Sequence, residues 1–322
     1  MMTPFRPQHA KPPMLDVDLS QPLWMLLAFV GLGWICARRL AVDPRPIATL
    51  LIYIIAPLTF FRGLTLGGPT VDYLLLTAAL FTLSSAMCLA VSYVARPFFA
   101  SQEAALLAFS AGTGNTGYFG LPIAMVLLPP EGVTQYLFCL LGTNLFEFTV
   151  GYYISARGQF SVRQSVAKIV RLPLVYAFAA ALLVSGIGLS LPGVVVEGLD
   201  YFKYCYTVLG MMIIGMTLGR VSMREVDTRF ILACVAARYL LWPLVSLLTV
   251  LGLQATVGIS AQLAMVLLLL GVVPMAANVV VVAMQLNIRP EKGAIAVLLT
   301  TLAAPLLIPF YLAGLLALAG LQ

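Results

Sequence analysis

The chain has 322 residues, of which 61% are hydrophobic and only 9% are charged, and its mean hydropathy is +1.03. This composition excludes an ordinary soluble domain and is typical of a polytopic membrane protein. The net charge of +6 does not indicate nucleic-acid binding, because the basic residues lie in short connections between apolar segments.

Residues 1–20 are polar and proline-rich without an apolar run, which predicts a disordered tail and no cleavable signal peptide. After the tail, the sequence predicts an all-α integral membrane protein with ten spanning helices. Each is long enough for a hydrocarbon core of about 30 Å. The predicted spans are residues 22–40, 46–63, 71–95, 103–128, 132–156, 168–189, 194–219, 229–252, 258–287 and 293–319.

The 18 Lys and Arg residues are distributed unequally between the two sides of these spans. Arg238 lies inside a span, and Arg6, Lys11, Arg62 and Lys203 lie on the side of the N-terminus. The other 13 follow the odd-numbered spans and are Arg38, Arg39, Arg45, Arg96, Arg157, Arg163, Lys168, Arg171, Arg220, Arg224, Arg229, Arg289 and Lys292. The positive-inside rule therefore predicts a cytoplasmic-membrane protein with both termini on the outer side.

The fourth and ninth predicted spans contain residues that do not fit an undisturbed helix. Residues 112–122 include four glycines, an asparagine and a proline, and residues 271–278 read Gly-Val-Val-Pro-Met-Ala-Ala-Asn. Backbone groups freed by such a break must face protein or water, because lipid cannot satisfy them. Two broken spans in matching positions predict two inverted five-helix repeats that meet at the binding site of a secondary carrier.

The polar residues of these breaks are the first candidates for substrate binding. The amides of Asn115 and Asn278 can bind a carboxylate, or they can simply cap the half-helices. In the fifth span, Asn144 shares a helix face with Thr143 and Glu147. The remaining residues predicted to bind substrate are Thr116, Gly117, Pro122 and Pro274.

Glu147 and Arg238 are charged residues well inside apolar segments. A buried charge is costly unless it is paired, so the sequence predicts an ion pair between them. The pair would be a structural lock or part of ion coupling, and a protonatable Glu147 would couple transport to H⁺. The alternative is that Arg238 extends to the membrane interface.

The break motifs, together with Ile-Ala-Pro-Leu-Thr-Phe-Phe at 55–61 and Arg-Tyr-Leu-Leu-Trp-Pro at 238–243, give the chain a family likeness. It resembles the auxin efflux carrier family, whose bacterial members are described as malonate, malate or auxin-like permeases. The resemblance covers essentially the whole chain after the tail. The long cytoplasmic loop of the plant members is missing here, since spans 5 and 6 are separated by about a dozen residues.

The resemblance implies a scaffold domain (residues 21–67 and 160–222, spans 1, 2, 6 and 7) and a mobile transport domain. The latter comprises residues 68–159 and 223–322, with spans 3, 4, 5, 8, 9 and 10. The implied fold is related to that of the sodium–bile acid symporters. The resemblance also implies that Asn115 lines the substrate site and that Thr59 faces the substrate from the scaffold.

The expected function is secondary active transport of a small organic anion, such as a mono- or dicarboxylate or an auxin-like acid, without a cofactor and by an elevator movement. The alternative is a sodium-coupled symporter, with Thr113, Asn115, Thr143 and Glu147 as Na⁺ ligands, assisted by Thr116 and Asn144. An enzyme is disfavoured because the only histidine is His9 in the tail. The Gly215-x-x-x-Gly219 pattern predicts either a homodimer through the scaffold or close packing within it.

Overall fold

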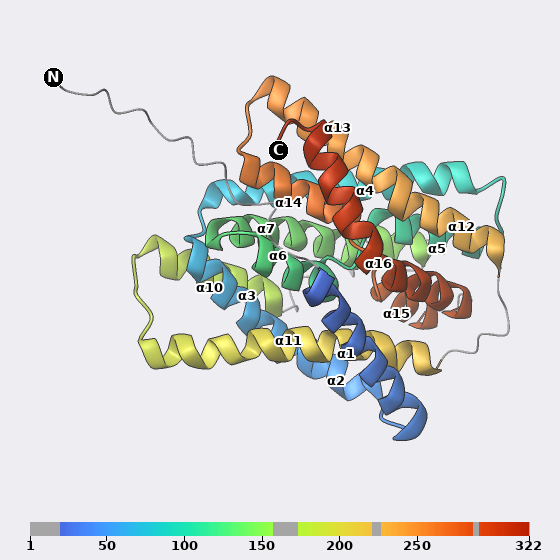
Figure 1. Ribbon diagram of the computed structural model, residues 1–322, viewed down its shortest axis with the longest axis horizontal. Helices are drawn as coiled ribbons and strands as arrows, with labels where there is room; N and C mark the ends of the chain where they lie inside the picture. Colours follow the sequence, from blue (N-terminus) through green and yellow to red (C-terminus); the bar gives the residue numbers. More distant parts are fainter. Residues whose placement is uncertain (1–19, 157–172, 221–226, 286–289, 322) are drawn as a thin grey trace.

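The computed structural model describes residues 20–156, 173–220, 227–285 and 290–321, which form helices and connections without a strand (Figure 1). Seven helical runs in these residues are apolar and long enough to cross a membrane: Gln21–Arg39, Pro44–Gly67, Val71–Ala95, Pro130–Ser155, Gly193–Arg220, Thr228–Thr256 and Lys292–Leu318. The predicted tail lies outside the described residues, as do the predicted domain boundaries near residues 160 and 222.

These runs are built from helices of very different lengths. In chain order the helices are α1 (Ser20–Arg39), α2 (Pro44–Leu50), α3 (Ala56–Gly67), α4 (Leu74–Ala95), α5 (Ser101–Gly112), α6 (Leu121–Leu127), α7 (Pro130–Phe146), α8 (Tyr152–Ser155), α10 (Pro173–Gly186), α11 (Gly193–Arg220), α12 (Thr228–Ala236), α13 (Trp242–Thr256), α14 (Ala261–Val272), α15 (Asn278–Gln285) and α16 (Pro290–Leu318).

The all-helical fold with several membrane-type helices is confirmed, and seven of the ten predicted spans are continuous apolar runs in the described residues. Two of the missing runs are the predicted broken spans. One consists of α5 and α6, separated by a non-helical stretch, and the other consists of α14 and α15. The third is α10, which has 14 residues in the described part of the chain. The inverted repeat remains a prediction.

The centre of the molecule is formed by α5, α7 and α14. The last nine residues of α5 and of α14 are all buried, and so is most of α7. A helix that is apolar and buried on every side lies inside a bundle and not at its lipid-facing surface. Because α5 and α14 each end at a predicted break, both breaks lie in the interior.

Glycines bring α1 and α11 together along the lower edge of Figure 1. A Cβ at Gly215 would lie 1.9 Å from the carbonyl oxygen of Val30, and one at Gly33 would lie 2.0 Å from that of Met212. Only glycine permits this approach. The predicted GxxxG face is therefore occupied by α1 of the same chain and is not free to form a dimer contact.

Three π-helical turns each end two residues before a proline. The turns are Leu51–Ile55, Thr116–Gly120 and Ala237–Leu241, followed by Pro57, Pro122 and Pro243. Proline lacks the N–H that would bond to the fourth preceding carbonyl, and its ring clashes with that carbonyl. A wider turn relieves the clash without ending the helix. A fourth π-helical turn, Glu147–Gly151, contains no proline.

Candidate functional site

The two helix breaks predicted from the sequence meet in the interior of the bundle. α5 ends at Gly112 and α14 ends at Val272, and both segments then become extended. The backbone N–H of Asn115 donates to the carbonyl of Pro274 at 2.7 Å, so a hydrogen bond joins the breaks directly. Backbone groups that lipid could not satisfy thus find partners within the protein.

The first break is capped by its own asparagine and by two aromatic side chains. Asn115 Oδ1 accepts a hydrogen bond from the backbone N–H of Phe119 at 3.2 Å and so caps the following turn. The carbonyl of Ala111 loses its helical donor at the break, and Trp242 Nε1 donates to it at 2.6 Å. The hydroxyl of Tyr136 donates to the carbonyl of the residue after Asn115 at 2.8 Å.

Arg238 donates hydrogen bonds to two backbone carbonyls at the end of α14. The carbonyl of Leu270 would normally accept from the residue four positions later, but that residue is Pro274, which has no N–H. Arg238 Nη2 donates to it at 2.5 Å instead, and Arg238 Nε donates to the carbonyl of Val273. The guanidinium carbon also lies 5.1 Å from the centre of the Trp242 ring. The negative end of a broken helix therefore stabilises this buried cation.

Glu147 is held by two neutral side chains at the other half of the second break. Its Oε2 accepts a hydrogen bond from Asn278 Nδ2 at 2.6 Å, and its Oε1 accepts one from the hydroxyl of Thr113. Asn278 is the first residue of α15. The carboxylate therefore lies near the N-terminus of a half-helix, where the helix dipole favours negative charge.

The predicted ion pair between Glu147 and Arg238 is not formed. Their side chains are 5% and 1% exposed, but none of their charged atoms approach within 4.0 Å of each other. The two charged side chains instead contact two consecutive residues of the first break. Thr113 bonds to Glu147, and a Cβ at Gly114 would lie 2.6 Å from the guanidinium carbon of Arg238. A broken helix offers free carbonyls at one end and a positive terminus at the other, so each charge is satisfied without a counter-ion.

Several polar groups around the crossing keep unused hydrogen-bonding capacity. Asn115 is 4% exposed, and its Nδ2 has no partner in the part of the chain that the structure describes. The side chains of Asn144, Tyr118 and Tyr206 likewise make no hydrogen bond to any described residue. The rings of Tyr118 and Tyr206 lie 5.4 Å apart, and the Tyr206 hydroxyl lies 2.7 Å from the position of a Cβ on Gly117.

Most of the other predicted site residues also lie at the crossing. The hydroxyls of Thr116 and Thr143 are 3.4 Å apart, and Pro122 lies in the first turn of α6. Thr59 behaves differently, because its buried hydroxyl donates to the carbonyl of Ile55 in its own helix at 2.8 Å. The structure therefore does not bring the Thr59 hydroxyl into a bond with the crossing.

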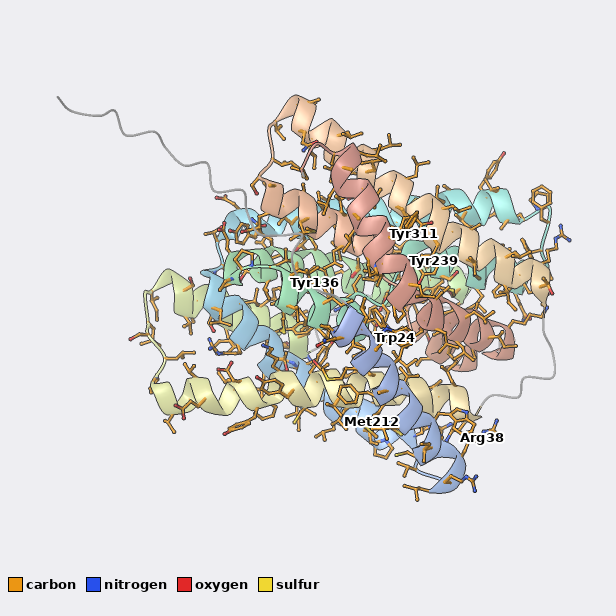
Figure 2. All side chains as sticks on the ribbon, in the orientation of Figure 1. Trp24, Arg38, Tyr136, Met212, Tyr239 and Tyr311 are labelled. Carbon is orange, nitrogen blue, oxygen red and sulfur yellow. The ribbon has the colours of Figure 1, made fainter. Side chains whose placement is uncertain are left out.

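The sequence pattern did not point to two tyrosines that link the turn Ala237–Leu241 to α16 and thereby support the second break. The rings of Tyr239 and Tyr311 stack 6.3 Å apart, side by side in Figure 2. Tyr311 donates to the carbonyl of Tyr239, which Pro243 leaves without its usual donor. Tyr239 donates in turn to the carbonyl of Thr300 at 2.6 Å, and the hydroxyl of Thr300 accepts from the N–H of Met275 at 3.3 Å. The sequence does contain a signal for this contact: Pro243 stands four positions after Tyr239 and leaves the Tyr239 carbonyl without its helical donor.

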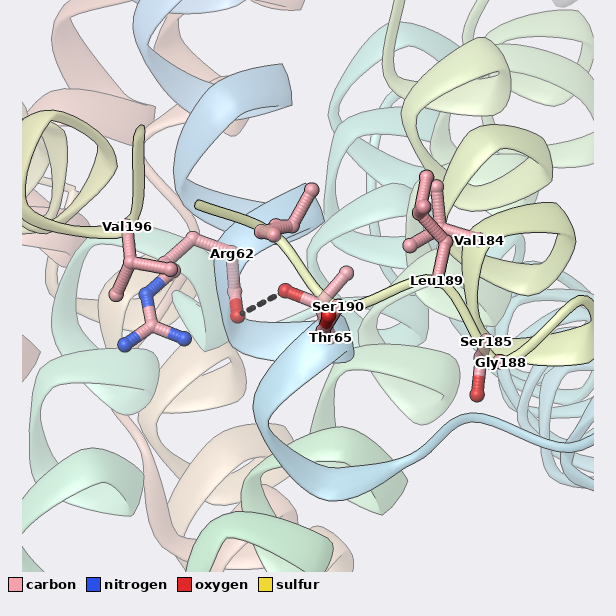
Figure 3. Close-up of a pocket in the computed structure, with 9 residues that line it drawn as sticks. Arg62, Thr65, Val184, Ser185, Gly188, Leu189, Ser190 and Val196 are labelled. Carbon is pink, nitrogen blue, oxygen red and sulfur yellow. Dashed lines mark hydrogen bonds between the residues drawn. The ribbon is translucent and has the colours of Figure 1, made fainter. Parts of the chain in front are cut away.

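A cavity of about 280 Å³ opens between α3 and the connection from α10 to α11 (Figure 3). Arg62 and the hydroxyls of Thr65, Ser185 and Ser190 line it. Its arginine is already paired, since Arg62 donates to both carboxylate oxygens of Asp200 at 2.8 and 3.2 Å. None of the residues of the crossing lines this cavity, so we assign the candidate site to the crossing.

Comparison with known proteins gives a partial similarity. No family model matches the chain. Over 112 residues it is 30% identical to a protein of Methanocaldococcus jannaschii described as an uncharacterized transporter. The match spans 33% of this chain and 36% of that protein, about a third of its length. This similarity and the seven apolar helical runs support a multi-pass membrane transporter in general, and they favour a transporter over an enzyme.

Proposed function

We propose that this protein is a secondary carrier for a small organic anion and a relative of the auxin efflux carriers. The observation that carries the proposal is the crossing, where two broken helices are joined through Asn115 and Pro274. Broken helices that meet in the interior of a membrane bundle are the usual site of substrate binding in such carriers. The similarity to a transporter over about a third of the chain agrees with this assignment.

The substrate class follows from the hydrogen-bonding groups that remain unused. Asn115 Nδ2 can only donate, and the free hydroxyls of Tyr118 and Tyr206 can donate as well. Several groups that can donate and that have no acceptor in the described residues suit a carboxylate. The N-terminus of α15 is a poorer place for that carboxylate, because Glu147 already lies there. We therefore place the substrate on the side of Asn115, Tyr118 and Tyr206.

An elevator movement agrees with the way the crossing is built. Every bond described above between the breaks and Arg238, Trp242, Glu147 and α16 stays within the proposed transport domain. Moving that domain as one body against α1, α3, α10 and α11 keeps those bonds intact. Export would need no second ion, because a membrane potential of about 100 mV supplies about 2.3 kcal/mol per charge. In this proposal the protein lies in the cytoplasmic membrane with both termini outside.

Sodium coupling is the second candidate. The hydroxyl of Thr113 bonds to Glu147, and the hydroxyl of Thr143 lies 3.4 Å from that of Thr116, so oxygen ligands of the kind that Na⁺ prefers are present on both α7 and the first break. Proton coupling through Glu147 is the remaining form of ion coupling. Both alternatives keep the same anion site and differ only in what accompanies the substrate.

The test is uptake of radiolabelled mono- and dicarboxylates into proteoliposomes, with and without a Na⁺ or pH gradient. Replacing Asn115 by alanine should weaken substrate affinity about 10- to 150-fold, as expected for one hydrogen bond to a charged group. Replacing Asn278 should weaken it less, because its amide acts through Glu147. The matched control is Gln254→Ala, which removes an amide that bonds to Ala319. Normal affinity in both asparagine variants would exclude the crossing as the binding site. Absence of carboxylate flux in the unmodified protein would exclude the function.

A further inference from the structure

An apolar groove runs along the outside of the proposed transport domain, between α4 and the run from α12 to α13. Its volume is about 390 Å³, within the range of about 300–1,000 Å³ typical of ligand pockets. Alanines Ala233, Ala236 and Ala237 line it together with larger residues, among them Val91, Leu240 and Leu244. Leu240 and Leu244 are largely exposed, so the groove opens toward the surroundings of the protein. Small residues beside larger ones give a channel in which an extended apolar chain can lie.

The groove leads to two arginines at one end. Arg229, Ala233 and Ala237 follow one another at intervals of four residues, so Arg229 continues the helix stripe that lines the groove. Arg96 directly follows α4, the opposite wall. Both side chains are exposed, and neither has a carboxylate partner in the described residues. The Arg229 guanidinium lies 5.2 Å from the centre of the Phe99 ring, in the connection from α4 to α5.

Two described carboxylates on the neighbouring segments, Glu103 and Asp227, are already engaged elsewhere. Lys292 donates to Glu103 at 2.5 Å and to Asp227 at 2.6 Å. Asp227 also accepts from the backbone N–H of Phe230 and so caps α12. Among the described residues, no carboxylate therefore pairs with the two positive charges at this end of the groove. By the distribution of basic residues, this end faces the cytoplasm.

We propose that the groove binds an anionic phospholipid, with one acyl chain along the alanines of α12 and the headgroup phosphate between Arg96 and Arg229. Charge complementarity selects this occupant, because arginine pairs well with phosphate and the cytoplasmic leaflet carries anionic lipid. A bound lipid here would contact α4, α5 and α12, three helices of the body proposed to move. The lipid would then travel with that body or be exchanged at each movement.

The experiment is a titration of the purified full chain with dioleoyl-phosphatidylglycerol and with dioleoyl-phosphatidylcholine, followed by native mass spectrometry. We expect one phosphatidylglycerol to bind more tightly than phosphatidylcholine. The double variant R96Q/R229Q should lose that preference, with phosphatidylglycerol affinity lowered about 30-fold, or about fivefold per arginine. The matched control R38Q/R39Q removes two exposed arginines from the end of α1, where Figure 2 labels Arg38. This control should keep the preference.

A second variant tests the groove itself. Ala236→Leu fills it and should weaken both lipids to a similar degree while leaving the arginines in place. Equal binding of the two lipids by the unmodified chain would overturn the proposal, as would an unchanged preference in R96Q/R229Q. If Ala236→Leu instead converts a dimer to a monomer with phosphatidylglycerol still bound, the groove is a contact between two copies and the proposal fails.

Discussion

Replacing Arg238 by glutamine tests whether the broken end of α14, and not a carboxylate, stabilises this buried cation. The guanidinium bonds to the carbonyls of Leu270 and Val273, and these charge-assisted bonds contribute about 3–6 kcal/mol together. The contact with the Trp242 ring adds up to about 2 kcal/mol. Removing a buried charge recovers several kcal/mol of desolvation, so we expect a net loss of about 2–4 kcal/mol.

The loss should be visible as a fall of about 5–10 °C in the unfolding temperature of the detergent-purified protein. Arg38→Gln, an exposed arginine of α1, is the matched control and should change stability by about 0.5 kcal/mol or less. The double variant R238Q/E147Q should be at least as unstable as R238Q alone, because no bond joins the two side chains. Recovery of stability in the double variant would refute this account and restore the direct ion pair.

Three further predictions follow from the same structure. The hydrogen bond from Lys292 and the backbone N–H of Phe230 hold the pKa of Asp227 below its ordinary value of about 3.9, so its contribution to stability is complete above about pH 5 and is lost as the pH falls below about 4. The difference in unfolding temperature between the unmodified protein and Asp227→Asn should accordingly be constant above about pH 5 and shrink below pH 4, and a pH-independent difference would contradict the assignment. A disulfide between cysteines at Gly63 and Leu137, where a Cβ at Gly63 would lie 2.7 Å from Leu137 Cδ1, should stop transport until it is reduced, in a background without the five native cysteines. A cysteine pair at Leu106 and Gly293, both inside the proposed moving body, is its control and should leave transport intact; full transport with the first disulfide closed would exclude the rigid-body movement. A reporter active only in the cytoplasm should stay silent when fused after Gln322, and activity there would reverse the predicted orientation.

The helix breaks could be predicted because they depend on local chemistry. Clustered glycines and prolines weaken a helix, so the ends of α5 and α14 could be placed from residues 112–122 and 271–278, whereas Pro305 and Pro309 lie inside α16 without ending it. The prolines also carry information about the local backbone. Pro57, Pro122 and Pro243 each follow a π-helical turn, and the carbonyl released by Pro243 is satisfied by Tyr311.

The partners of the buried charges could not be predicted in the same way. The rule that a buried charge needs compensation holds for both Glu147 and Arg238, but it does not say which group supplies the compensation. Pairing them with each other is the simplest choice when only side chains are considered. The decisive groups are at the two ends of the second break, which contact the turns Ala237–Leu241 and Glu147–Gly151 that carry the two charges.

The two charges also bear on how the protein can move. Arg238 lies at the C-terminal end of α14, and Glu147 lies near the N-terminal end of α15, so each is stabilised by the half-helix whose dipole complements it. Unwinding or closing the second break would remove the partners of both charges at once. Each charge would then remain buried at a cost of several kcal/mol. A movement that carries α7, α13 and both half-helices together avoids this cost at every stage. We therefore expect the crossing to keep its internal bonds throughout transport, and we expect the movement to occur at contacts such as that of Gly63 with Leu137.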